Sequence, residues 1–440
     1  MTDAPEVERT DRECFEGAED ALLEGDRPFP LRQEPSPSGL SALHNRTFRI
    51  VYFGAFASNV GTWMQNVVLG ALAYDLTKSS EFVGLLVFAQ LGPLLLLSLV
   101  GGALADTFDR RRILVLVSVE QIAFTLALAW LVRSPHPSHA LLFLLVLAIG
   151  VGQAIYAPTF TATLPGLVGR ENLSSAISLN SAQMNASRVI GPAIGSLLYA
   201  KVGASWVFTG NAVSYVFIIL ALLVVQLPPV PFAHRPQRPR DLLTGIGVAR
   251  ADRVVTRCLV SIYLFSFFCL PFVSQMPVLA HDNLGIAPKS TSYGLLYASF
   301  GLGAVAGALA IGTRVAMRWK PDLARSGLVA FAVALAVFAL LRTPGPAYPM
   351  VFLVGFAYFA TITALSTVIQ ERVDDAVRGR VMALWIMGFG GTVPLGALAS
   401  GPLIAASSVT TVVLGGAIVA LAIVAIADLR DRATIAHAPR

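Results

Sequence analysis

Long apolar runs follow one another along most of this chain at nearly regular spacing. They predict helices at residues 48–74, 82–105, 112–132, 140–164, 174–200, 203–227, 256–281, 291–313, 323–342, 348–370, 379–405 and 408–428. Each run is near or above the ~20 residues that an α-helix needs to cross the hydrocarbon core of a bilayer. The chain is 55% hydrophobic and 13% charged, whereas a soluble domain carries roughly 25% charged residues. The sequence therefore predicts an all-α integral membrane protein with twelve transmembrane helices.

The basic residues are divided unequally between the loops that join these helices. Seventeen Lys and Arg side chains fall in the loops on one side and five in the loops on the other. Cytoplasmic loops carry the excess of Lys and Arg in membrane proteins. This asymmetry places both termini in the cytoplasm and predicts a multi-pass protein of the plasma (inner) membrane. The net charge is +6, and its positive part lies in the loops that would face the cytoplasm. There membrane lipid, rather than nucleic acid, is the nearest partner.

The longest interior connection divides the chain into two sets of six helices. We expect a disordered acidic cytoplasmic tail at 1–46, an N-terminal six-helix bundle at 47–227, a cytoplasmic linker at 228–255, a C-terminal six-helix bundle at 256–428 and a cytoplasmic tail at 429–440. The acidic, proline-rich tail buries too little apolar surface to order itself. The second half of the linker, 241–255, has the spacing of a short amphipathic helix, which we expect on the inner leaflet. Gly84-Leu85-Leu86 is echoed by Gly294-Leu295-Leu296, which indicates a weak repeat between the two halves.

The charged turn between the second and third predicted helices carries the clearest motif. It reads Gly101-Gly102-Ala103-Leu104-Ala105-Asp106-Thr107-Phe108-Asp109-Arg110-Arg111-Arg112-Ile113-Leu114. This pattern resembles the signature loop of the major facilitator superfamily, with Thr107 and Asp109 in place of the usual Arg and Gly. The resemblance implies that Asp106 lies against the start of a helix in the other half and holds one transport state closed on the cytoplasmic side. The residues of this predicted cytoplasmic gate loop are Gly102, Leu104, Asp106, Asp109, Arg110 and Arg111. An ordinary basic turn is the alternative, although the inside-positive bias explains only the arginines.

Further motifs are similar to those of the enterobactin-exporter-like branch of the same superfamily. They include Gly61-Thr62-Trp63-Met64-Gln65, Arg188-Val189-Ile190-Gly191-Pro192 and Arg378-Gly379-Arg380-Val381. In the fifth helix, Ser187-x-x-x-Gly191-Pro192-x-x-Gly195-Ser196 resembles an antiporter signature. Gly191 and Gly195 permit the close approach of another helix, and Pro192 permits a bend. Plain helix packing is the alternative interpretation of these small residues.

Two full charges fall well inside the predicted helices, Glu120 in the third and Arg188 in the fifth. An unpaired charge at that depth is costly, so Arg188 should face the cavity or a partner. It is a candidate for holding a carboxylate or catecholate-like anion, and a hydrogen bond to backbone carbonyls is its alternative role. Glu120 is a candidate for coupling proton flow, or a structural acid.

Polar side chains on helices that line the passage in the resembled fold complete the predicted cavity. They are Asn59, Gln65, Asn66, Gln153, Tyr156, Gln275 and Tyr358. Buried amides and phenols need partners, which a water-filled cavity supplies. Hydrogen bonding between helices accounts equally well for any one of them.

The sequence carries no pattern typical of a metal, nucleotide or catalytic site. His136 and His139 lack a neighbouring Cys or carboxylate, so we expect no metal there. The sequence contains no Gly-x-x-x-x-Gly-Lys-Ser/Thr, Gly-x-Ser-x-Gly or His-Glu-x-x-His run. We therefore expect no cofactor and no enzyme activity, and transport that runs on an ion gradient.

Together these features predict a secondary transporter, acting as a monomer, that exports a small amphipathic molecule in exchange for protons. The substrate would be siderophore-like or drug-like. Two alternatives remain open: uptake by symport on the same fold, and a transport-inactive sensor or scaffold that acts through the acidic tail. The antiporter-like motif favours export over uptake, and the gate loop favours a working transporter.

Overall fold

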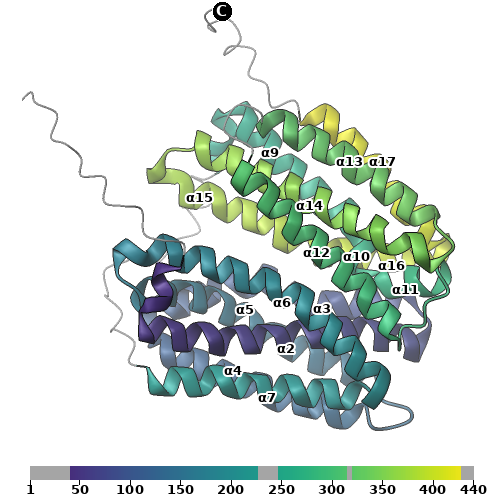
Figure 1. The fold of residues 1–440 in the computed structure, drawn as a ribbon, viewed down its shortest axis with the longest axis horizontal. Coiled ribbons are helices and arrows are strands. Elements are labelled where there is room, and N and C mark those ends of the chain that lie inside the picture. Colours follow the sequence, from purple (N-terminus) through teal and green to yellow (C-terminus); the bar gives the residue numbers. More distant parts are fainter. Residues whose placement is uncertain (1–39, 226–245, 315–319, 428–440) are drawn as a thin grey trace, which may run out of the picture.

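The computed structural model describes residues 40–225, 246–314 and 320–427, and every regular element in these ranges is a helix (Figure 1). In the first half these are η1 (Ser41–His44), α2 (Arg46–Thr77), α3 (Ser80–Thr107), α4 (Arg110–Leu131), α5 (His139–Leu167), η2 (Arg170–Asn172), α6 (Leu173–Val202) and α7 (Ala204–Val224). In the second half they are α9 (Arg253–Leu264), η3 (Phe265–Cys269), α10 (Pro271–Ser274), α11 (Met276–Asp282), α12 (Thr291–Arg314), α13 (Lys320–Leu340), α14 (Pro344–Arg372), α15 (Asp375–Ile386), η4 (Met387–Gly391), α16 (Thr392–Ala406) and α17 (Val409–Ile426).

Most of these helices are long and apolar enough to cross a membrane. The described residues contain nine such spans, or ten if the bent pair Ser80–Leu95 and Val100–Thr107 is counted as one span. The helices α2 and α6 are 32 and 30 residues long but are not among them. Polar side chains interrupt their apolar sequences; α6, for example, carries Asn180, Gln183 and Arg188. The predicted count of twelve includes these two helices and stays a prediction.

The helices form two bundles that lie side by side (Figure 1). In the bundle drawn from purple to teal, α2 packs against α6 and α7, α3 against α5, and α4 against α5 and α7. In the green to yellow bundle, α14 packs against α12 and α13, and α13 against α17. The first bundle meets the second along two seams, α3 against α16 and α6 against α12.

The two seams use equivalent glycines of the predicted repeat. Gly84 of α3 lies so close to Ala397 O of α16 that there is no room for a side chain. Gly294 of α12 lies in the same way against Ser196 of α6. Glycine at such positions lets two helix backbones approach closely. The weak sequence repeat therefore corresponds to matching contacts in the fold.

The predicted helix at 256–281 is not one continuous α-helix. The π-helical η3 follows α9, and the two short helices α10 and α11 each begin within one residue of a proline, Pro271 and Pro277. Proline has no backbone N–H and cannot continue the hydrogen-bond ladder of a helix. A second π-helical segment, η4, interrupts the predicted helix at 379–405.

In the described part of the linker, 246–255, residues 246–251 are helical and α9 begins at Arg253 after the N-cap Asp252. Ala249 is buried against the second bundle, and its carbonyl accepts a hydrogen bond of 2.6 Å from Thr256 Oγ1. The predicted position of this segment on the inner leaflet stays a prediction. At the other end, η1 falls within the predicted tail but packs on α6, where the Ala42 N–H donates to Ser175 Oγ at 3.2 Å. Residues 1–39 and 429–440 of the predicted tails and residues 228–245 of the linker lie outside the described residues.

Candidate functional site

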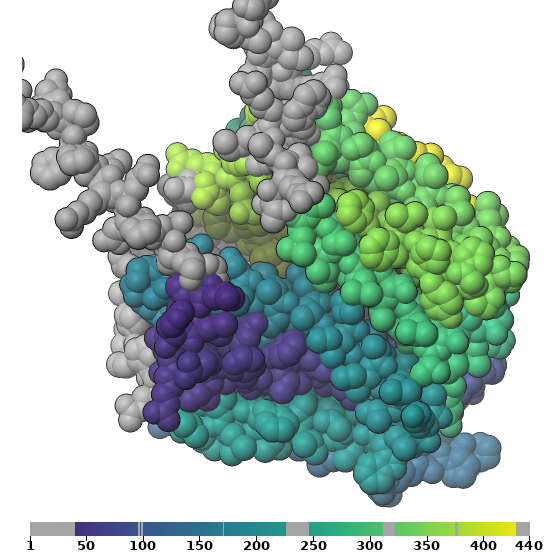
Figure 2. All heavy atoms as spheres, viewed as in Figure 1, coloured from purple at the N-terminus to yellow at the C-terminus, as the bar shows by residue number. Residues whose placement is uncertain are grey.

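The two bundles are joined by hydrogen bonds where α3 begins. Ser80 Oγ donates a hydrogen bond of 2.9 Å to Gly401 O of α16, and Gln275 Nε2 donates to Ser80 O at 3.1 Å. Gln275, which the sequence predicts in a substrate cavity, is instead fully buried in this seam. We call this the outer end of the molecule, because the gate loop lies at the opposite end of α3. In Figure 2, teal atoms of the first bundle and green atoms of the second are in contact toward the right.

A second contact at the outer end joins the last turns of α2 and α11. Tyr74 Oη donates a hydrogen bond of 2.6 Å to Asp282 Oδ1, and His281 Nδ1 lies 2.9 Å from the same oxygen. The rings of Tyr74 and His281 meet edge to face, with centroids 5.4 Å apart. Sequence reasoning missed this contact. In the sequence, the polar pair His281-Asp282 at the end of an apolar run was the one feature that pointed to a polar contact there.

The seams extend from the outer end to about the middle of the bundles. Gly391 lies against Leu95 Cδ1, and a Cβ atom on Gly301 would lie 3.1 Å from Arg188 O. Toward the other end, where the gate loop and α15 lie, the ribbons of the two bundles diverge in Figure 1. The contacts between bundles described here therefore concentrate in the outer half of the molecule.

Arg188 lies at the boundary between the two bundles, near the middle of the molecule on the seam between α6 and α12. Its guanidinium carbon is 5.3 Å from the centre of the Trp63 ring on α2 and 5.4 Å from that of Phe359 on α14. Nη1 donates to Asn185 Oδ1 at 3.4 Å, whereas the buried Nε has no hydrogen-bond partner among the described atoms. Each cation–π contact contributes about 0.5–2 kcal/mol, depending on desolvation. The predicted anion-binding residue thus has an aromatic neighbour from each bundle and an unused N–H donor.

Aromatic side chains continue from this point into the second bundle. Tyr358, predicted to line the cavity, stacks on Phe265 at 5.8 Å and on Phe300 at 5.9 Å between ring centroids. It is 6% exposed and is the direct chain neighbour of Phe359. The wall beside Arg188 is therefore aromatic and closely packed.

The glycines of the antiporter-like motif explain how Arg188 reaches Trp63. A Cβ atom on Gly191 would lie 2.8 Å from Val60 O, and one on Gly195 would lie 2.8 Å from Met64 Cα. Both glycines thus let α6 lie directly on α2, one and two turns beyond Arg188. Pro192, within the same helix, has its carbonyl near Gly294 of α12. The motif acts in this structure as a packing surface that sets the position of Arg188.

The other predicted cavity residues do not gather at one place. Gln65 accepts a hydrogen bond of 2.9 Å from Asn211 Nδ2, and Asn66 accepts one from Gln90 Nε2, so both join helices of the first bundle. Tyr156 stacks on Phe160 inside the same bundle. Asn59 on α2 and Gln153 on α5 are half-buried. For Gln65 and Asn66 the geometry shows hydrogen bonding between helices, whereas the stacking of Tyr156 on Phe160 lies within α5.

Glu120 lies away from the boundary between the bundles. It is on α4, which packs against α5 and α7, and its carboxylate lies beside Gly152 of α5. Gln121 Nε2 donates to Glu120 Oε2 at 3.0 Å and to Ile149 O at 2.8 Å. This environment suits a structural acid, and a coupling role for Glu120 stays a prediction.

In the gate loop, Asp106 was predicted to contact the start of a helix in the other half. In this structure it lies beside an arginine of its own bundle. Asp106 Oδ1 lies 3.9 Å from Nη2 of Arg110, in its own turn. Arg110 also donates to Ala105 O at 3.0 Å and to Ala162 O of α5 at 2.7 Å. Asp106 is therefore held within the first bundle in this structure.

The remaining gate-loop residues shape the turn and the helix that follows. Asp109, which departs from the family pattern, is the N-cap of α4, because its Oδ1 accepts the Arg111 N–H at 2.8 Å. Such a cap stabilises a helix start by about 0.5–2 kcal/mol. Leu104 O accepts the Phe108 N–H at the end of α3, and Gly102 faces open space. Local capping rules applied to the sequence could have identified the role of Asp109.

Comparison with known proteins defines the class to which this fold and site belong. Residues 37–438 match the family model described as transmembrane secretion effector. The chain is 30% identical over 342 residues to the enterobactin exporter EntS of Escherichia coli O1:K1 / APEC, a match that covers 77% of this chain and 80% of that protein. The EntS protein of Shigella boydii serotype 4 (strain Sb227) matches with the same identity and coverage.

Solved structures with the same fold are also transporters. The nucleoside transporter NupG superposes with a TM-score of 0.70 at 16% identity, covering 87% of this chain and 99% of that one. A bacterial homologue of the iron transporter ferroportin, in an inward-facing state, gives a TM-score of 0.68 at 15% identity and covers 87% and 98%. The protein is thus a multi-pass transporter of the plasma (inner) membrane and not an enzyme. It belongs to the transmembrane secretion effector family of the major facilitator superfamily.

Proposed function

We propose that this protein exports a small amphipathic molecule from the cytoplasm in exchange for protons, acting as a monomer. In this proposal the chain crosses the membrane twelve times, because α2 and α6 span it together with the ten more apolar segments. Both termini then lie in the cytoplasm. The excess of Lys and Arg in the loops on one side supports this orientation. The polar side chains of α2 and α6 suit helices that line a water-filled passage, because intramembrane polar groups face such cavities or one another.

The observation that carries the proposal is the position of Arg188. Its aromatic neighbours Trp63 and Phe359 belong to different bundles, so any movement of one bundle relative to the other changes its surroundings. An arginine presents its N–H donors in a rigid fork suited to carboxylates and other oxyanions. An anionic group of a substrate can bind the unused Nε, while an apolar part packs against the aromatic wall.

The relatives support both the direction and the class of substrate. Proteins 30% identical to this chain are named enterobactin exporters, and enterobactin gives the class that we call siderophore-like. A substrate with an anionic group and an aromatic or apolar body matches the guanidinium and rings around Arg188. Proton antiport is supported by the resemblance of the Gly191 and Gly195 motif to an antiporter signature.

The geometry suits one state of an alternating-access cycle, in which the bundles move about a central site. With the outer seams formed, this state would be closed at the outer end, and we take it to be the one that is open to the cytoplasm. Asp106, now 3.9 Å from Arg110 of its own turn, would bind the start of a helix in the second bundle when the inner ends meet. Each end would then be closed by its own contacts, Tyr74 with Asp282 outside and Asp106 inside.

Inverted membrane vesicles with an acidic lumen provide the test. A catecholate siderophore added outside should dissipate the proton gradient in vesicles that contain the wild-type protein. Arg188→Ala should abolish this response, and Arg188→Lys should restore only part of it, since lysine lacks the planar fork.

The matched control is Arg133→Ala. Arg133 lies beyond the end of α4, where its Nε donates to Ser205 Oγ at 3.0 Å, so the same change there should leave transport intact. Membrane levels of all variants are compared by immunoblot. A normal response in Arg188→Ala would overturn the role of Arg188, and a gradient unaffected by any anionic candidate in wild type would overturn proton-coupled export.

A further inference from the structure

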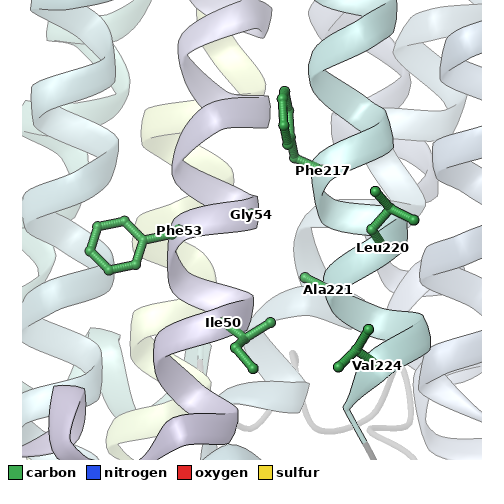
Figure 3. A pocket seen from close by; sticks show the side chains of 7 residues that line it. All are labelled: Ile50, Phe53, Gly54, Phe217, Leu220, Ala221 and Val224. Carbon is green, nitrogen blue, oxygen red and sulfur yellow. The ribbon is translucent and has the colours of Figure 1, made fainter.

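A groove runs along the outside of the first bundle, between α2 and α7 (Figure 3). It is open along one side, has a volume of about 320 Å³ and is lined by apolar side chains, among them Ile50, Phe53, Phe217, Leu220 and Val224. The last four of these are between 53% and 69% exposed. In a membrane protein, a face of this composition lies in the hydrocarbon, so what fills the groove is a lipid chain rather than water.

The floor of the groove is set by a close contact between the two helices. A Cβ atom on Gly54 would lie 2.9 Å from Ala221 Cβ and 3.0 Å from Phe217 O. In Figure 3 the Phe53 side chain points away from α7, and Ile50 and Val224 form the two walls at one end. Glycine in the middle of the floor and bulky residues on its rim therefore leave a shallow, open groove along the two helices, which we call the channel.

Basic side chains stand at the end of this channel where α2 begins and α7 ends. Arg111 Nη2 donates a hydrogen bond of 2.6 Å to Leu223 O, directly beside Val224. This bond fixes the guanidinium at the mouth and leaves its other N–H donors for a ligand. Arg46 is exposed and lies one helical turn before Ile50, on the same side of α2.

We propose that this groove binds an anionic phospholipid of the cytoplasmic leaflet, with one acyl chain in the channel and the headgroup phosphate on Arg111 and Arg46. The cytoplasmic assignment rests on the orientation given in the proposed function. Guanidinium groups bind phosphate oxygens through charge-assisted hydrogen bonds. Each basic side chain near an anionic surface strengthens binding about fivefold, so the mouth favours an anionic lipid over a zwitterionic one.

The test compares phosphatidylglycerol with phosphatidylcholine of identical acyl chains on the purified full-length protein in detergent. Bound lipid is counted by native mass spectrometry, and stabilisation is measured as the shift of the thermal unfolding midpoint. Wild type should bind phosphatidylglycerol at least fivefold more tightly. Arg111→Gln should reduce this preference about fivefold. The matched control Arg112→Gln removes a charge from the next residue, which is 84% exposed and lies 3.8 Å from Asp109, and should leave the preference unchanged.

A second pair of variants tests the channel itself. Ile50→Trp fills one wall and should weaken the binding of both lipids alike. Ile418→Trp, on the exposed face of α17 in the second bundle, should weaken the binding of neither. Equal binding of the two lipids by wild type, equal effects of Arg111→Gln and Arg112→Gln, or an Ile50→Trp variant that binds like wild type would overturn the proposal. These measurements need no transport, so their failure is distinct from a failure of the proposed export.

Discussion

The hydrogen bond from Tyr74 to Asp282 should help to hold the outer end of the molecule closed. It joins α2 of the first bundle to α11 of the second, and any opening of the outer end must break it. We predict that Tyr74→Phe shifts the protein toward a state in which the outer end is open. Asp282→Asn should act in the same direction, because a neutral amide accepts the hydrogen bond more weakly than a carboxylate.

The size of the shift follows from the environment of the bond. A hydrogen bond to a charged group contributes about 1.5–3 kcal/mol. Tyr74 is 5% exposed, but the side chain of Asp282 is 43% exposed, so water can replace part of the lost interaction. We therefore expect the lower limit, about 1.5 kcal/mol, which changes the ratio of closed to open molecules about tenfold.

Distances between spin labels at the outer ends of α6 and α16 report this ratio. Lys201→Cys and Ser407→Cys place the labels on exposed residues of the two bundles. The buried Cys258 and Cys269 are out of reach of the label, and Cys14→Ser removes the remaining thiol. Pulsed electron resonance should show a short-distance population in wild type and a larger long-distance population in Tyr74→Phe.

Tyr199→Phe is the matched control. The Tyr199 hydroxyl donates to Asp75 of the same bundle at 3.5 Å, and phenylalanine keeps the ring that faces Lys289 before α12. The substitution therefore removes a hydrogen bond within one bundle and not one between the bundles. The distance distribution should then remain that of wild type. If Tyr74→Phe and Asp282→Asn also give the wild-type distribution, the bond does not hold the outer end closed and the reasoning is refuted.

Three further predictions concern packing, coupling and pH. Gly191→Leu should destabilise the protein by about 1–3 kcal/mol through overpacking against Val60 and lower its unfolding temperature in detergent. Glu120→Gln should retain proton-coupled export in the vesicle assay, because Glu120 faces α5 rather than the boundary between bundles. Loss of coupling in this variant would instead support the predicted role of Glu120 in proton flow. Burial alone would raise the pKa of Asp252, but the hydrogen bond from Arg372 and two backbone N–H groups bring it below its ordinary value of 3.8. A lowered pKa in the folded state gives stability that is present at neutral pH and lost as the pH falls through that pKa. Asp252→Asn should therefore reduce the acid sensitivity of the unfolding temperature, and an unchanged profile would contradict this.

Features that depend on short stretches of chain could be predicted from the sequence. The apolar runs located nearly all the helices to within a few residues, since the length and polarity of a membrane helix are set locally by the bilayer. The charged turn at Asp106, the small residues at Gly191 and the unusual depth of Arg188 were also visible in the sequence. The interruptions at Pro271 and in η4 were not predicted, because apolar runs show length and polarity but not the hydrogen-bond pattern within the helix.

Tertiary structure alone decided which side chains meet. Tyr74 and Asp282 are 208 positions apart and hydrogen-bond only because the two bundles pack at their outer ends. Likewise, hydropathy could not show which side of a helix Gln65 or Gln275 occupies, so residues predicted to share one cavity lie in separate contacts. The same holds for Arg188, whose depth was evident from the sequence but whose aromatic partners come from helices of different bundles. Local sequence sets the length and polarity of each helix, whereas close packing of distant helices determines which polar groups become partners.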